Sequence, residues 1–193
     1  MEENDVSRRR YELVIIGGSA GGLEAIIQIL EEIKHCGLTI IIVLHRKWAV
    51  DSALVGILSS RSPLLVKEAE EKEILMPGTI YLAPADYHLL IEKDRSVSLD
   101  ASEKINFSRP SIDVSFESAA EIYGPLAAAV LLSGGSSDGV EGLKKIKAMG
   151  GLCIVQDPGS ALVEYMPRQA IDNVEVDHQM NAVEIGAFLN ELR

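Results

Sequence analysis

Short, almost entirely apolar runs alternate along this chain with segments of helical periodicity, and that alternation restricts the fold more than any other feature. The apolar runs lie at residues 13–16, 38–44, 127–132 and 152–155. Such runs are typical of strands buried on both faces of a parallel sheet. Between them, apolar residues recur at intervals of three and four, as on one face of a helix, at residues 23–33, 54–58, 116–123 and 140–149. The alternation predicts an α/β fold with a doubly wound, mostly parallel, Rossmann-like sheet in three layers.

The middle of the chain departs from this alternation and predicts a small antiparallel element. A Met-Pro-Gly turn at residues 76–78 leads into a strand at 80–83. Residues 88–91 and 97–99 then have the pattern of a hairpin inserted into the fold. Further predicted elements are a short strand at 64–66 and a last amphipathic helix at 182–192.

The composition indicates a single domain and excludes several classes of protein. With 193 residues, of which 47% are hydrophobic, the chain can bury one full core, so we expect one domain at 13–193 after a loosely ordered stretch at 1–12. No apolar run approaches the roughly 18 residues of a transmembrane helix, and residues 1–10 are too polar for a secretory signal. We therefore expect a cytosolic protein without membrane insertion. The net charge of −11 argues against nucleic acid as a partner.

The two cysteines give no reason to expect a metal site or a disulfide. They are Cys36 and Cys153, and Cys153 lies within the apolar run 152–155. The prediction is a reduced, buried thiol.

The first glycine-rich loop is the strongest candidate for chemistry. Residues 17–22 read Gly-Gly-Ser-Ala-Gly-Gly and join a predicted strand to a predicted helix, which is the context of a nucleophile elbow with Ser19 at its centre. The N-terminus of the following helix would favour a developing oxyanion. Anion binding and tight packing are the alternatives. The dinucleotide fingerprint fits less well, because Ser19 stands where the second glycine is needed, and the Walker pattern is absent.

A serine nucleophile needs a general base, and a histidine base needs an acid to orient it. Ligands of open α/β sheets bind where the strands end, and only His45 of the four histidines leaves a central strand at the same edge as Ser19. Asp138 and Asp157 both follow strands at that edge. Asp138 could instead cap the next helix, and Asp157 could instead form a turn before Pro158. Spacing alone does not choose between the two aspartates.

Several ordered motifs then resemble the catalytic domain of the CheB-type protein-glutamate methylesterases of bacterial chemotaxis, from about residue 13 to the end of the chain. The family's Gly-Ala-Ser-Thr-Gly-Gly stands here at 17–22, and the histidine of its Gln-His-Met-Pro stands as His45. Its Thr-Gly-Met-Gly-x-Asp-Gly loop corresponds to Ser-Gly-Gly-Ser-Ser-Asp-Gly at 133–139. Three further family motifs are present: Pro-Gly-x-x-Tyr-x-Ala-Pro at 77–84, Arg-Pro-Ser-x-Asp at 109–113, and Gln-Asp at 156–157 with Met-Pro at 166–167.

The resemblance implies a serine esterase that demethylates glutamyl methyl esters of methyl-accepting chemotaxis receptors, with glutamine deamidation as a possible second activity. It implies a triad of Ser19, His45 and Asp138, and so selects Asp138 over Asp157. Backbone N–H groups near Ala20 and Gly135 are the candidate oxyanion donors, and no metal or organic cofactor is required. Candidates for the substrate groove are Arg46, Arg109 and Met166.

The chain also departs from the family in three respects. The residues before the domain leave no room for the usual receiver domain, so the sequence gives no support for regulation through phosphorylation of such a domain. Gly135 stands where the family has methionine, and the neighbours of His45 differ from the family pattern. These changes motivate a second hypothesis, a catalytically weakened signalling module that binds a partner through the same groove. An anion- or nucleotide-binding domain is a third.

Overall fold

Seven parallel strands form the central sheet of this computed structural model, within the described residues 10–34, 37–46 and 51–192. The strand order across the sheet is β3-β4-β2-β1-β7-β8-β9. The strands are β1 (Leu13–Gly18), β2 (Thr39–Leu44), β3 (Leu65–Glu68), β4 (Thr79–Leu82), β7 (Ala127–Leu131), β8 (Leu152–Gln156) and β9 (His178–Met180). The central strands are buried along their whole length, as their apolar runs predict.

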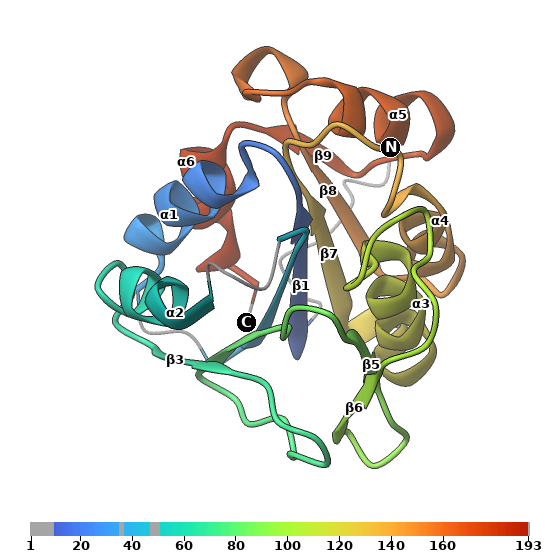
Figure 1. Cartoon of the computed structure of the whole chain (residues 1–193). Helices are drawn as coiled ribbons and strands as arrows, with labels where there is room; N and C mark the ends of the chain where they lie inside the picture. Colours follow the sequence, from blue (N-terminus) through green and yellow to red (C-terminus); the bar gives the residue numbers. More distant parts are fainter. Residues whose placement is uncertain (1–9, 35–36, 47–50, 193) are drawn as a thin grey trace.

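Helices cover both faces of the sheet, so the predicted three-layer, doubly wound fold is confirmed (Figure 1). One face packs against α1 (Gly22–Glu32), α2 (Asp51–Ser59) and α6 (Ala182–Leu189). The other face packs against α3 (Ile112–Tyr123), α4 (Val140–Ala148) and α5 (Tyr165–Asn173). Alternate residues of β1 show the division, because Val14 and Ile16 belong to the first core and Leu13 and Ile15 to the second.

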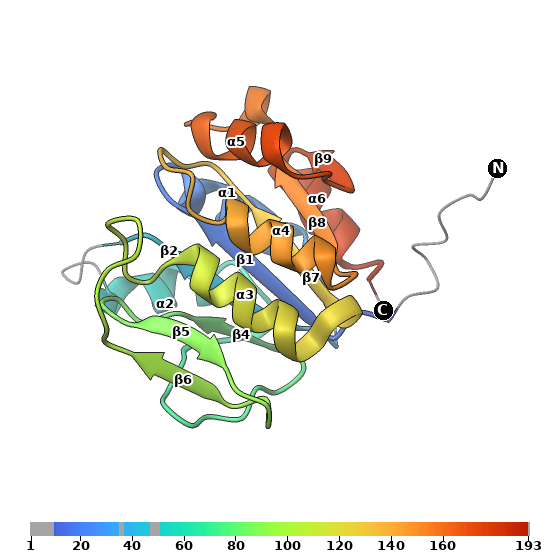
Figure 2. The same cartoon turned by 90° about the vertical axis from the view of Figure 1, so that its right-hand side faces the viewer.

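The predicted hairpin is present but forms a sheet of its own. Strands β5 (His88–Ile91) and β6 (Val97–Asp100) pair with each other in antiparallel register. The hairpin lies beside α3, as Figure 2 shows, and Ser115 of that helix donates a hydrogen bond to the Leu89 carbonyl at 2.7 Å. The hairpin is therefore an addition beside the parallel sheet rather than a part of it.

Two elements, α5 and β9, were not expected from the sequence. Strand β9 reads His-Gln-Met and lies at the sheet edge, where it is only partly buried, so it lacks the apolar run that marks the other strands. Helix α5 buries only Met166, Pro167 and Ala170. The last helix also ends at Leu189, three residues before the predicted end. Short elements with few buried side chains leave a weak periodic signal.

Buried Cys153 has the environment that the sequence predicts. The side chain is fully buried and is a free thiol, and burial raises its pKa to about 12. Cys36 lies outside the described residues. Among those residues, no helix has both the length and the apolar character needed to cross a membrane.

The carboxyl ends of β1, β2 and β7 meet at one edge of the sheet, because β1 lies between the other two. The chain runs outward from β1 on one side through β2, and on the other side through β7, so this is the point where the strand order reverses. Open α/β sheets bind their ligands at such a point.

Candidate active site

Three loops that follow neighbouring strands carry the predicted triad. Ser19 follows β1, His45 follows β2, and Asp138 lies in the loop between β7 and α4. Backbone hydrogen bonds hold these loops together at the sheet edge: the His45 N–H donates to the Gly18 carbonyl at 3.1 Å, and the Ser19 N–H donates to the Ser133 carbonyl at 2.9 Å. Three segments distant in sequence therefore converge on one place.

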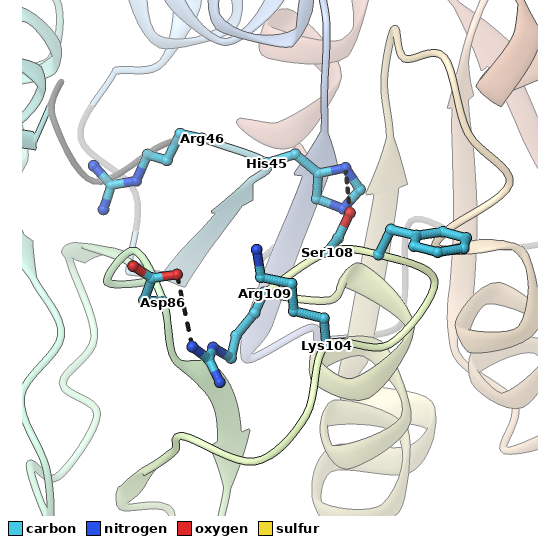
Figure 3. A pocket seen from close by; sticks show the side chains of 7 residues that line it. His45, Arg46, Asp86, Lys104, Ser108 and Arg109 are labelled. Carbon is cyan, nitrogen blue, oxygen red and sulfur yellow. Dashed lines mark hydrogen bonds and ion pairs between the residues drawn. The ribbon is translucent and has the colours of Figure 1, made fainter.

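His45 and Asp138 are in direct contact. The distance between His45 Nε2 and Asp138 Oδ2 is 2.7 Å, and the Asp138 side chain is fully buried while the His45 side chain is 12% exposed. A carboxylate only accepts, so it favours the tautomer with the proton on Nε2 and a lone pair on Nδ1. Nδ1 lies 3.4 Å from the Ser108 hydroxyl (Figure 3). The imidazole is thus oriented as a base with its free nitrogen away from the acid.

Asp138 is held by the start of helix α3. Its carboxylate accepts hydrogen bonds from the Ile112 and Asp113 N–H groups, at 2.7 and 3.0 Å, and from the Ser111 hydroxyl at 3.0 Å. Burial opposes ionisation of Asp138, but the hydrogen bonds from His45 and from the helix outweigh it, so its pKa is lowered. Asp138 is therefore an ionised carboxylate without contact to solvent.

The other aspartate that spacing left open has a different partner. Asp157 follows β8, one strand further out, and its carboxylate accepts a hydrogen bond from Gln179 Nε2 at 2.7 Å. Asp138 does not cap the next helix either, because Gly139 occupies the cap position of α4. The structure brings Asp138, and not Asp157, to His45.

Asp113 supports Asp138, and the sequence did not reveal this role. Its Oδ1 accepts hydrogen bonds from the Gly139 and Gly142 N–H groups, both at 2.8 Å, so α3 and α4 cap each other's N-termini through Asp113 and Asp138. Burial raises the pKa of Asp113 to about 7, and the charge of Asp138 contributes. In the sequence, only the Arg-Pro-Ser-x-Asp motif at residues 109–113 pointed to Asp113.

A second serine and histidine, Ser111 and His88, lie behind Asp138. The Ser111 N–H donates to His88 Nδ1 at 3.1 Å, and His88 Nε2 contacts the Glu103 carbonyl at 2.9 Å. Both side chains are buried, and the Ser111 hydroxyl is directed at Asp138. These groups have no access to a protein substrate, so they support the acid rather than attack an ester.

Ser19 lies against the aspartate loop with its hydroxyl unengaged. Within the described part of the chain, that hydroxyl makes no hydrogen bond. A Cβ atom added at Gly134 would lie 3.0 Å from Ser19 Cβ, so the two loops are in close contact and a larger residue at 134 would have to displace Ser19. The backbone N–H groups of Ala20 and Gly135 likewise have no partner among the residues that the structure describes. They are available as donors beside Ser19.

A pocket of about 580 Å³ opens beside His45 (Figure 3). Of the three predicted groove residues, Arg46 and Arg109 line it. Met166 does not, because its side chain is fully buried and would touch a Cβ at Gly134 at 2.5 Å. The expectation for Met166 is corrected: it packs beneath the aspartate loop and supports it from the core. No group of three or more potential metal-ligating side chains occurs within the described residues.

Comparison with known proteins places this arrangement in context. The sequence profile of the CheB methylesterase family matches residues 14–189. A putative protein-glutamate methylesterase/protein-glutamine glutaminase of Leptospira interrogans is 47% identical over 183 residues, which are 94% of this chain and 95% of that protein. A protein-glutamate methylesterase/protein-glutamine glutaminase of Thermotoga maritima is 36% identical over 94% of this chain and 54% of its own length.

A solved structure shows the same fold. The crystal structure of the Thermotoga maritima CheB methylesterase catalytic domain superposes with a TM-score of 0.91 at 35% identity. The match covers 95% of this chain and 99% of that one. The similarity therefore extends over both helical layers and the site at the sheet edge.

Proposed function

The chain belongs to the CheB methylesterase family, and from that membership we propose that Ser19, His45 and Asp138 are the triad with which it hydrolyses glutamyl methyl esters. The enzyme class is that of a carboxylic ester hydrolase, a protein-glutamate methylesterase. The observation that carries the triad is the 2.7 Å hydrogen bond between His45 and the buried Asp138, beside a serine with an unengaged hydroxyl.

In the proposed acylation step, His45 Nδ1 takes the proton of the Ser19 hydroxyl as the oxygen attacks the ester carbonyl. The step requires the Ser19 hydroxyl, which has no hydrogen-bond partner among the described residues, to reach Nδ1. The negative charge on the tetrahedral intermediate is stabilised by the N–H groups of Ala20 and Gly135. His45 then gives its proton to the methoxide leaving group, so methanol departs and a glutamyl ester of Ser19 remains.

Deacylation uses the same imidazole in reverse. Water loses a proton to His45 Nδ1 and attacks the acyl carbonyl, and Ser19 leaves with that proton as glutamate is released. Asp138 holds the ring and stabilises the imidazolium in both steps. Replacing methanol by ammonia as the leaving group gives glutamine deamidation, the second activity in the names of the relatives from Leptospira and Thermotoga.

The proposed substrates are the cytoplasmic parts of methyl-accepting chemotaxis receptors. The family acts in chemotaxis, and a carboxyl methyl ester on a protein side chain is the substrate that its relatives' names specify. A triad at an exposed sheet edge, rather than in an enclosed cavity, can accept an ester carried on another protein.

Methanol release from methylated receptor membranes tests the proposal. We expect release by the wild-type protein and a loss of about 10³-fold or more for Ser19→Ala, because the nucleophile is removed. Ser108→Ala is the matched control, since the Ser108 hydroxyl lies 3.4 Å from His45 Nδ1. Labelling by a fluorophosphonate followed by peptide mapping identifies the nucleophile directly. Equal release by Ser19→Ala and wild type, or label on Ser108, contradicts the assignment of Ser19.

A further inference from the structure

The pocket beside His45 carries a charge opposite to that of the whole chain. The chain has 18 basic and 29 acidic residues and a net charge of −11. The pocket is lined instead by three basic side chains, Arg46, Lys104 and Arg109, and by one acidic side chain, Asp86. A concave site lined by charges of one sign attracts ligands of the other sign. The pocket is thus suited to an anionic group held close to the catalytic base.

Both arginines are fixed in the walls of this pocket. Arg46 donates to the Ala83 carbonyl at 2.8 Å and to Glu68 at 3.1 Å. Arg109 donates to two backbone carbonyls of its own loop, at 2.8 and 2.6 Å, and its Nη2 lies 3.7 Å from Asp86. The guanidinium groups brace the loops around the pocket, and their charges are partly compensated by the neighbouring carboxylates.

Lys104 is different, because its charge is available. The side chain is exposed, and its ammonium group makes no hydrogen bond or ion pair with any residue that the structure describes. In Figure 3 it extends into the middle of the pocket. An ammonium on a flexible stem carries three donors and binds a carboxylate as a point charge.

The loop that follows Lys104 places an aromatic side chain, Phe107, at the same pocket. Asn106 and Phe107 have φ angles of 49° and 64°, in the left-handed region that residues with a Cβ seldom adopt. Phe107 is 97% exposed and lines the pocket. An aromatic ring and an ammonium group that line the same pocket suit a side chain with a short aliphatic stem and a carboxylate end, as in glutamate.

We propose that this pocket is a subsite for a second acidic side chain of the protein substrate, adjacent to the glutamyl ester, and that Lys104 is its specificity-determining residue. The inference rests on the proposed function and adds a substrate preference to it. The acidic side chain enters beside His45, and its carboxylate pairs with Lys104. The pairing holds the neighbouring ester near Ser19 and raises the affinity for acidic segments over neutral ones.

The matched control for Lys104 is Lys93. Residues 88 and 100 pair at one end of the β5–β6 hairpin and residues 91 and 97 at the other, so Lys93 lies in the turn at the far end from the loop that carries Lys104. Lys93 is exposed. The variants Lys104→Glu and Lys93→Glu change the net charge equally.

The test compares two methylated receptors in membranes: one with glutamates beside the methyl ester, and one with those glutamates changed to glutamine. We expect Lys104→Glu to raise KM for the acidic receptor about 10-fold, with a much smaller change in kcat, and to change KM for the neutral receptor less than 2-fold. Lys93→Glu should match the wild type on both. Raising NaCl to about 0.5 M should reduce the difference between the receptors.

Several results would overturn the subsite. They are an unchanged KM of Lys104→Glu on the acidic receptor, an equal rise on both receptors, and an equal effect of Lys93→Glu. Fluorophosphonate labelling of Ser19 checks the catalytic site separately, and a slower labelling of Lys104→Glu would assign its effect to a disturbed triad and reject the subsite. If the wild-type protein labels at Ser19 but releases no methanol, the proposed function fails instead.

Discussion

The replacement Asp138→Asn tests the core of the site, because it keeps the size of the side chain and removes one acceptor. Asp138 accepts from His45 and the Ile112 N–H on Oδ2, and from the Ser111 hydroxyl and the Asp113 N–H on Oδ1. An asparagine has a single acceptor oxygen. In either orientation its amide NH₂ therefore faces a backbone N–H at the start of α3. If it also faces His45, it forces the proton onto Nδ1, where it blocks the base.

The size of the expected losses in stability and in kcat follows from these contacts. Losing a hydrogen bond to a charged group costs about 1.5–3 kcal/mol, and leaving a buried N–H without a partner costs about 1–3 kcal/mol. The sum, roughly 2.5–6 kcal/mol, applies to the free energy of unfolding. A similar loss in stabilisation of the imidazolium lowers kcat by about 10²–10⁴, because each 1.36 kcal/mol is a factor of ten.

Methanol release from methylated receptor membranes measures kcat, and urea denaturation measures the free energy of unfolding. Asp157→Asn is the control, since Asp157 follows the next strand and contacts Gln179 rather than His45. We expect it to keep kcat within about 3-fold of the wild type. If Asp138→Asn retains wild-type kcat, or if Asp157→Asn loses as much, the assignment of the acid is wrong.

Three further predictions follow from particular contacts. Gly134→Ala should lower kcat at least about 10-fold, because its Cβ would lie 2.5 Å from Met166 and 3.0 Å from Ser19; unchanged methanol release contradicts the close contact. The pKa of Asp113 is raised to about 7, so the native state holds its proton more tightly than the unfolded state, and the free energy of unfolding should fall as pH rises from about 4 to 7. Asp113→Asn should make the free energy of unfolding, measured by urea titration, depend less on pH. An unchanged slope counts against the raised pKa of Asp113. In a Cys36→Ser background, Cys153 should react with a thiol reagent only after unfolding, and fast labelling of the native protein would disprove its burial.

Local sequence patterns predicted the central strands and most helices because each depends on nearby residues. The run at β1 is apolar on both faces, and Gly21 reaches a φ of 77° at the start of α1. The same patterns missed β9, whose position at the edge requires only partial burial. They also placed the hairpin within the fold without showing that it forms a separate sheet, because pairing between distant segments leaves no periodic trace.

The site residues, like the strands and helices, were predicted from local patterns in part and misplaced in part. The strand-loop-helix pattern around Ser19 and the position of His45 after a central strand predicted two members of the site without any knowledge of the sheet order. Met166 was misplaced, because a methionine beside a catalytic loop can lie above it or beneath it, and only packing distinguishes the two.

The sequence by itself determined the fold class and the family, and it predicted Ser19 as the nucleophile and His45 as the base. Residue spacing left Asp138 and Asp157 open, and resemblance favoured Asp138 without a physical reason. The tertiary structure provides that reason, because β7 lies directly beside β1 while β8 lies one strand further out. The contacts of Asp113 with the start of α4, and the position of Lys104 in the pocket beside His45, also depend on the tertiary structure. The effect of a charged side chain depends on which distant groups surround it, and long-range packing decides that.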